Sequence, residues 1–206
     1  MNKIPSVDLR DFLSGEPERK QKFVNEIGKA YEEIGFVALK GHFLNDQLVD
    51  ELYDEVKQFF ELPVETKQKY EIPGIGGQRG YVGFGKETAK GFKKGDLKEF
   101  WHFGQYLENG SKYATEYPDN IEVTENSKFN VVGKEAFQML EKTGIYVLRA
   151  LALHLGLDEF YFDKYVAEGN SILRPIHYPP ITEEPDNAVR AAAHGDINLI
   201  TLLMGA

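Results

Sequence analysis

The residues best suited to chemistry lie near the end of the 206-residue chain, in the sequence His194-Gly195-Asp196. Side chains two positions apart on a β-strand point to the same face, so the imidazole and the carboxylate would lie side by side. One histidine, one carboxylate and a distant third ligand form the facial arrangement that binds Fe(II) and leaves positions open for substrate and O₂. Five histidines and 33 acidic residues make roughly one such pair expected by chance. The pair alone therefore also fits an ordinary His and Asp at a strand end.

The composition limits the metal chemistry and the partners. The chain has no cysteine, which excludes disulfides and thiolate metal sites, so a metal must be bound through nitrogen and oxygen. The net charge of −9 argues against a nucleic-acid partner, because phosphates are bound by basic surfaces. The longest apolar stretch, residues 145–157, is too short to span a bilayer, and the first residues lack the apolar region of a signal peptide. We therefore expect a cytoplasmic protein without a membrane partner.

Periodicity predicts the elements that must position the pair. Apolar residues recur at helical spacing in four segments, residues 17–34, 45–62, 127–155 and 158–167. Five shorter runs have strand character, residues 4–9, 36–39, 171–178, 189–193 and 197–203. The opening strand–helix–strand–helix order predicts a small α/β layer, and the last three strands predict the entry to an antiparallel β-domain. Two or three strands cannot close a barrel or bury both of their faces, so we expect this domain to be incomplete in the chain.

The middle of the chain contains a glycine- and lysine-rich excursion, residues 71–95, with a hairpin expected near Gly80-Tyr81. Four lysines within it and one just after it could attract an anionic substrate or form an ordinary solvated surface: Lys86, Lys90, Lys93, Lys94 and Lys98. Four aromatic residues are candidates for the walls of a substrate pocket, or for core: Tyr81, Phe84, Phe100 and Trp101. The sequence leaves both alternatives open.

Segments spread over nearly the whole chain resemble, in order, the isopenicillin N synthase-like family of 2-oxoglutarate/Fe(II)-dependent oxygenases. The resemblance is strongest around the His-x-Asp pair, where RAAAHGDINLITLL matches the family's His-x-Asp followed by an apolar strand. Other matching segments are IPSVDL at residue 4, GFV with KGH at residues 35–42, FFELP at residue 59 with Glu65, Lys67 and Tyr70, Gly80-Tyr81 with Glu87, DLKEF at residue 96 and RPIHYPP at residue 174.

The resemblance implies an α+β fold in which an N-terminal α/β layer with helices leads into a double-stranded β-helix, or jelly-roll, core. It implies an N-terminal dioxygenase-type domain at residues 1–120, helical support at 121–170 and the first jelly-roll strands at 171–206. His194 and Asp196 would be the first two iron ligands, and Tyr178 would reach 2-oxoglutarate. The third ligand, a histidine, and an Arg-x-Ser pair for 2-oxoglutarate would lie past Ala206. We also considered His177 as a substitute ligand.

Activity in such a family couples the decarboxylation of 2-oxoglutarate by O₂ at Fe(II) to oxidation, usually hydroxylation, of a small-molecule substrate. No catalytic residue is expected beyond the metal ligands. Two alternatives remain: an inactive truncated remnant or partner-binding fragment of such an enzyme, and an unrelated cupin-like module that binds a divalent ion through the His-x-Asp pair. The sequence does not identify the substrate or the oligomeric state, and some family members use no 2-oxoglutarate.

Overall fold

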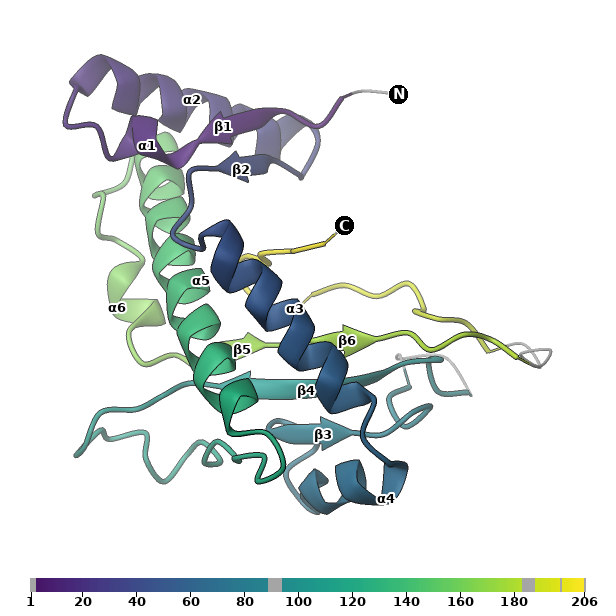
Figure 1. Ribbon diagram of the computed structural model, residues 1–206. Coiled ribbons are helices and arrows are strands. Elements are labelled where there is room, and N and C mark those ends of the chain that lie inside the picture. Colours follow the sequence, from purple (N-terminus) through teal and green to yellow (C-terminus); the bar gives the residue numbers. More distant parts are fainter. Residues whose placement is uncertain (1–2, 89–93, 183–187, 197, 206) are drawn as a thin grey trace. The chain divides into compact units, whose positions relative to one another are not determined.

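The computed structural model in Figure 1 describes residues 3–88, 94–182, 188–196 and 198–205. The chain divides into two compact units, each assembled from segments that are far apart in the sequence. The first unit contains Met1–Asp46, Gln138–Gly169 and Leu202–Ala206, and the second contains Gln47–Phe137 and Asn170–Thr201. The expected division at residues 120 and 170 stays a prediction.

The first unit opens with two strands joined by two helices. β1 (Ser6–Asp8) pairs in parallel with β2 (Ala38–Lys40), and α1 (Leu9–Phe12) and α2 (Pro17–Glu33) lie between them in the chain. Helix α2 is amphipathic, and its buried face consists of Phe23, Val24, Ile27, Gly28 and Ala30. This spacing is the helical periodicity that predicted the element.

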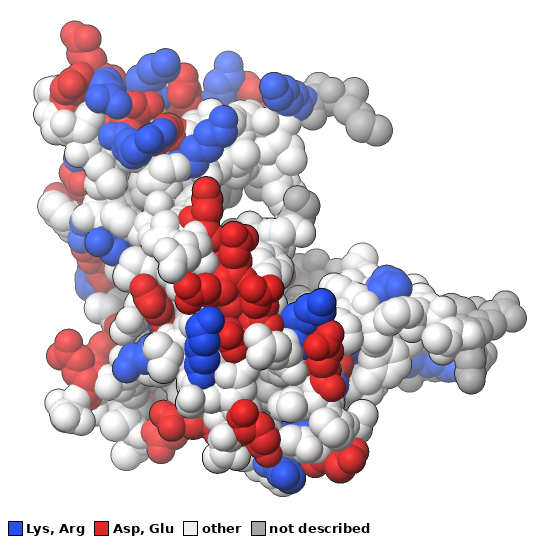
Figure 2. Space-filling model, in the orientation of Figure 1, with Lys and Arg blue, Asp and Glu red and all other residues white. Residues whose placement is uncertain are grey.

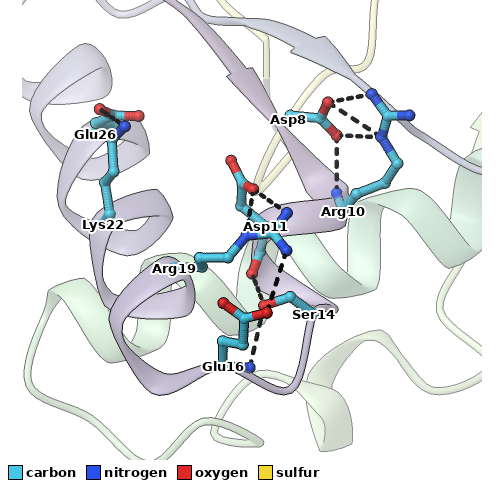
Figure 3. Close-up of polar contacts among 8 residues, drawn as sticks. All are labelled: Asp8, Arg10, Asp11, Ser14, Glu16, Arg19, Lys22 and Glu26. Atoms are coloured by element: carbon cyan, nitrogen blue, oxygen red, sulfur yellow. Dashed lines mark hydrogen bonds and ion pairs between the residues drawn. The ribbon is translucent and has the colours of Figure 1, made fainter.

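Polar contacts fix the start of each of these helices, as Figure 3 shows. The Asp8 carboxylate caps α1 by accepting the backbone N–H of Arg10 at 3.0 Å. Arg19 of α2 binds the Asp11 carboxylate at 2.6 Å, which ties the two helices together. The pair Lys22–Glu26, by contrast, is separated by 3.8 Å on the exposed side of α2 and adds little stability.

The second unit contains the sheet on which the candidate site is built. Strand β4 (Glu99–Gly104) pairs antiparallel with β3 (Gly80–Val82), with β5 (Ile172–Leu173) and with β6 (Ile176–His177). The register sets Glu99 opposite His177 and Phe103 opposite Leu173. Every residue of β4 is buried, because the strand lies in the middle of this sheet and is covered on both faces.

Helix α3 (Asp46–Phe60) lies over one face of the sheet and ends before α4 (Val64–Lys67) and a 3₁₀ turn (Gln68–Tyr70), as Figure 1 shows. Its last turn inserts Phe59 beside Trp101, with ring centroids 5.0 Å apart. The first turn of α5 (Ser127–His154) adds Phe129, whose ring stacks on Phe59 at 4.9 Å. The outer side of α3 carries a concentration of acidic side chains (Figure 2), which follows from its sequence DQLVDELYDEV.

The helices and the first strands agree with the sequence predictions to within a few residues. Gly80 and Tyr81 lie in strand β3 and pair with His102 and Trp101 of the distant β4, so the chain does not turn at Gly80-Tyr81. Three predictions were wrong. Only Asp163–Val166 (α6) is helical within residues 158–167, and β5 and β6 occupy four residues of 171–178. The described residues of the segments 189–193 and 197–203 form no strand. None of the helices in the described part of the chain is long and apolar enough to cross a membrane.

Candidate metal centre

His194 and Asp196 lie close together in the second unit. The His194 Nε2 atom is 3.6 Å from Asp196 Oδ1, and about half of each side chain is exposed. The His194 Nδ1 atom lies 2.8 Å from the carbonyl oxygen of Ala192, which can only accept a hydrogen bond. In the neutral imidazole the proton is therefore on Nδ1, and Nε2 keeps its lone pair. The other Asp196 oxygen, Oδ2, accepts the Thr201 hydroxyl at 2.6 Å.

Irregular backbone, not a β-strand, brings these two groups together. The two side chains lie close together, as expected. The expected cause is wrong, because residues 194–196 do not form a strand. A strand requires a neighbouring backbone that pairs along its length. Here the chain is held at separate points: Val189 O accepts the Leu97 N–H at 2.8 Å, and the Ala192 N–H donates to Asp96 Oδ1 at 3.2 Å.

Behind this segment lies a network of charged groups around Asp96 and Lys98, which are 2% and 4% exposed. The Lys98 ammonium binds Asp96 at 2.8 Å and Glu87 at 2.7 Å. Glu87 in turn accepts a hydrogen bond from Arg174 at 3.2 Å. Burial raises the pKa of Glu87, but its contacts with Lys98 and Arg174 outweigh that effect and hold the pKa below the usual value. Burial without such pairing would be costly for each charge.

His102 is a buried residue that joins this network through Arg174. Its Nε2 atom accepts the Nε–H of Arg174 at 2.6 Å, so its proton is on Nδ1, which lies 2.6 Å from the carbonyl oxygen of Gly77. Burial, reinforced by the nearby Arg174 charge, lowers the pKa of His102 to about 4. This histidine is therefore neutral at physiological pH and serves as a fixed hydrogen-bond acceptor.

A second buried cluster lies around Glu99. The Lys67 ammonium binds the Glu99 carboxylate at 2.8 Å and the Phe60 carbonyl oxygen at 2.9 Å. The Tyr81 hydroxyl donates to the same carboxylate, and His177 Nδ1 lies 2.8 Å from it. Burial raises the pKa of Glu99, but the hydrogen bonds from these three donors lower it further than that, so the net shift is downward. The cluster supports His177 in one orientation, stacked on the Phe60 ring at 5.2 Å.

A half-open cavity of about 310 Å³ lies beside this cluster. Its walls are Val64, Lys67, Gln68, Tyr81, Gly83, Phe84, Lys86, Glu99 and Pro179. Two of the aromatic residues expected around a pocket, Tyr81 and Phe84, thus line this cavity. Trp101 packs in the aromatic core instead, and the ring of Phe100 is covered by the Arg174 guanidinium at 4.4 Å. Tyr178, the residue before Pro179, is 39% exposed, and its carbonyl oxygen accepts a hydrogen bond from Arg190 at 3.3 Å.

Two of the five lysines singled out from the sequence form ion pairs. Lys86 pairs with Glu71, and Lys98 is buried rather than solvated. Lys90 and Lys93 lie outside the described residues. The sequence did not reveal the buried contacts of Asp96 and Lys98: Lys98 was expected either to attract an anionic substrate or to be solvated, and Asp96 was noted only as part of the DLKEF segment. The aromatic run that follows them, residues 100–103 (FWHF), indicates a buried strand, but the sequence does not show that Asp96 and Lys98 are buried with it.

The donor set of the His194–Asp196 pair fits a divalent iron ion. Imidazole nitrogen and carboxylate oxygen are both ligands of Fe(II), and metal-binding histidines commonly donate their other ring N–H to a backbone carbonyl, as His194 does. Within the described residues no third His, Asp or Glu joins the pair. His177 contacts Glu99 instead, and its use as a substitute ligand stays a prediction.

Comparison with known proteins identifies the family of the chain. Residues 4–125 match the family described as non-haem dioxygenase in morphine synthesis N-terminal. A 2-oxoglutarate-dependent dioxygenase from Dothideomycetidae sp., frbA, is 31% identical over 97% of the chain and 62% of its own length. A similar enzyme from Aspergillus flavus, imqE, is 29% identical over 98% of the chain and 63% of its own length.

Two solved structures extend the similarity to the fold. A 2OG-Fe(II) oxygenase family protein from Caulobacter crescentus superposes with a TM-score of 0.82 at 38% identity, over 96% of this chain and 62% of that one. A full-length Neurospora crassa protein in complex with alpha-KG gives a TM-score of 0.78 at 27% identity, over 95% and 63%. The chain thus spans a little over three fifths of the length of these relatives. It belongs to the family described as non-haem dioxygenase in morphine synthesis N-terminal, and the relatives named above are 2-oxoglutarate-dependent dioxygenases.

Proposed function

We propose that this protein acts as an Fe(II)- and 2-oxoglutarate-dependent oxygenase that hydroxylates a small molecule with O₂. The observation that carries the proposal is the His194–Asp196 pair, with Nε2 and Oδ1 separated by 3.6 Å and each ligand held by its own hydrogen bond. Family membership alone would support the fold, whereas this geometry supports the chemistry.

In the proposed reaction, Fe(II) held by His194 Nε2 and Asp196 Oδ1 supplies the redox chemistry when it is bound together with 2-oxoglutarate. One molecule each of 2-oxoglutarate, O₂ and substrate C–H gives succinate, CO₂ and the hydroxylated product, so one oxygen atom goes to succinate and one to the substrate. The protein's contribution is to orient the ligands. Ala192 O holds the His194 proton on Nδ1, and the Thr201 hydroxyl restrains Asp196. Tyr178 is the residue we assign to 2-oxoglutarate.

The cavity beside Glu99 is the candidate site for the organic substrate. A volume of about 310 Å³ suits a small molecule, and its wall combines the aromatic side chains of Tyr81 and Phe84 with the buried Lys67–Glu99 pair. Small-molecule chemistry is also consistent with a relative: a second structure of the Neurospora crassa protein, 27% identical to this chain, contains alpha-KG and thymine. The polar atoms of the pair already satisfy one another, so substrate selection would rest on shape and on the aromatic surfaces.

Anaerobic titration of Fe(II) into the protein with 2-oxoglutarate tests the proposal, because 2-oxoglutarate bound to ferrous iron produces a visible charge-transfer band. We expect the band in the wild type and its loss in His194→Ala and Asp196→Ala. Two exposed residues elsewhere provide matched controls, and the band should survive His42→Ala and Asp119→Ala. Tyr178→Phe should raise the concentration of 2-oxoglutarate needed for half-saturation.

The alternative is a non-catalytic fragment that folds without retaining iron. A wild-type protein that is folded but gives no band, and releases no succinate with Fe(II) and O₂, would support this alternative. A band of undiminished intensity in His194→Ala would show that iron binds elsewhere and that the ligand assignment is wrong.

A further inference from the structure

Two hydrogen bonds that share Ala192 link the buried Asp96 to the imidazole of His194. Asp96 Oδ1 accepts the N–H of Ala192 at 3.2 Å, and the carbonyl oxygen of the same residue lies 2.8 Å from His194 Nδ1. Ala192 is held on both sides in this way. It is 4% exposed, whereas Ala191, Ala193 and His194 are exposed, so Ala192 is the point at which this segment is anchored.

The anchor is itself fixed in place. Asp96 Oδ2 binds the Lys98 ammonium at 2.8 Å, which leaves Oδ1 for the Ala192 N–H. A hydrogen bond to an ionised carboxylate is stronger than one to a neutral oxygen, and in a buried setting it has no competition from water. The Leu97 N–H contributes a second anchor at Val189 O, five residues before His194. Of the two anchors, the Asp96 contact is closer to His194 in the sequence, because it holds Ala192 whereas Leu97 holds Val189.

We propose that Asp96 is a positioning residue for the metal ligand His194, acting through both sides of Ala192 to keep the imidazole proton on Nδ1 and Nε2 free for the metal. This inference rests on the proposed function for its biological meaning, but its structural content concerns the metal-free protein. Without the Asp96 contact, Ala192 would lose its fixed orientation, and the imidazole could exchange between tautomers. Outer-shell groups of this kind typically contribute 10- to 100-fold to metal affinity.

The first test reads the tautomer directly. Two-dimensional ¹H–¹⁵N spectra of the imidazole side chains, recorded on metal-free protein about two units above the ordinary histidine pKa of about 6.5, separate the Nδ1–H from the Nε2–H form. We expect His194 to be predominantly Nδ1–H in the wild type and mixed in Asp96→Ala. Asp96→Asn keeps an acceptor oxygen for the Ala192 N–H and should retain more of the Nδ1–H form than Asp96→Ala.

Glu87→Gln is the matched control. Glu87 is the other carboxylate on Lys98, at 2.7 Å, but it makes no contact with Ala192. This variant perturbs the same lysine and should keep the wild-type tautomer of His194. A folded Asp96→Ala protein with the wild-type Nδ1–H population would overturn the inference, as would a wild type whose His194 is mainly Nε2–H. Fluorescence of the single, buried Trp101 verifies that each variant is folded.

The second test measures metal affinity, with Co(II) as an air-stable probe. The dissociation constant should rise 10- to 100-fold in Asp96→Ala and by less than about threefold in Glu87→Gln. Equal losses in the two variants would mean that general damage to the charged network, not the Ala192 contact, controls the site. If the wild type shows the expected tautomer but no His194-dependent Co(II) binding, the proposed function fails while the role of Asp96 in orienting the imidazole stands.

Discussion

Lys67→Met removes the cation from the buried cluster beside the cavity and leaves the Glu99 carboxylate behind. The two side chains are 5% and 7% exposed, and their closest N–O distance is 2.8 Å. Removing one partner of such a pair costs about 3–5 kcal/mol, because the remaining charge is buried without compensation. Tyr81 and His177 still donate to Glu99, and this favours a loss at the lower end of that range. The Phe60 carbonyl loses its Lys67 donor, and this favours a loss at the upper end. We expect a loss of about 4 kcal/mol at pH 7.

Urea unfolding followed by Trp101 fluorescence measures this loss within the relevant unit, because Trp101 is the chain's one tryptophan and packs against Phe59 in the same core. Lys57→Met is the matched control. It makes the same substitution in the same unit, where Lys57 and Glu61 are exposed and 3.9 Å apart, and should cost less than about 0.5 kcal/mol. The double variant Lys67→Met/Glu99→Gln should recover part of the loss, since no charge then remains unpaired.

The pH dependence checks the cause. In the wild type the pKa of Glu99 lies below its usual value, so its ion pair contributes stability above about pH 4.3, and that stability is lost as pH falls through the folded-state pKa. In Lys67→Met burial prevails and should raise that pKa, so the penalty exists only while Glu99 is ionised. The difference between wild type and variant should therefore shrink in acid. A Lys67→Met penalty no larger than that of Lys57→Met, or one that does not change between pH 7 and pH 4, would refute this account.

Two further predictions concern the same unit. The pKa of His102 is lowered to about 4 by burial and by Arg174, so the neutral form stabilises the fold above about pH 6.5. Wild-type protein should lose up to about 3 kcal/mol relative to His102→Gln as pH falls from 6.5 to 4, measured by urea unfolding; equal slopes would contradict this. Gly133→Ala would place a Cβ atom 2.1 Å from the Phe103 ring, and we expect a net loss of about 1–2 kcal/mol despite alanine's better helix propensity. A gain in the urea midpoint would show that the ring moves aside freely.

The helices of this chain were predictable because their information is local. The spacing of apolar residues in α2 and α3, the proline at the start of α2 and the glycine after α5 act within a few residues of one another. The segments at 189–193 and 197–203 have equally apolar sequences, yet strand formation depends on a partner backbone that the sequence of the segment does not specify. Their described residues lack such a partner, and β-type composition alone does not produce a strand.

Of the candidate site, only the proximity of His194 and Asp196 was predictable from the sequence. His194 and Asp196 are two residues apart, so a short motif reveals them, whereas the buried polar contacts of this unit join residues that are far apart in the sequence. Asp96 is 96 residues from Ala192, and Lys67 is 32 residues from Glu99. Nothing in the spacing of five lysines indicates which of them finds a buried carboxylate. Composition favours a solvated surface for each, and Lys98 departs from that rule because two acids surround it.

Strand β4 explains why the site and the core depend on each other. Glu99, Trp101 and Phe103 share one face, toward α3 and α5, whereas His102 and Phe100 share the other with Arg174. Each face therefore carries a charged cluster that is stable only when its partners are in place. On the second face the chain of contacts continues through Glu87 and Lys98 to Asp96, and so to Ala192 and the ligand pair. Docking of the segment that carries His194 completes the hydrogen bonding of a buried aspartate, so, under our proposal, the contacts that fold this face of the sheet also orient His194.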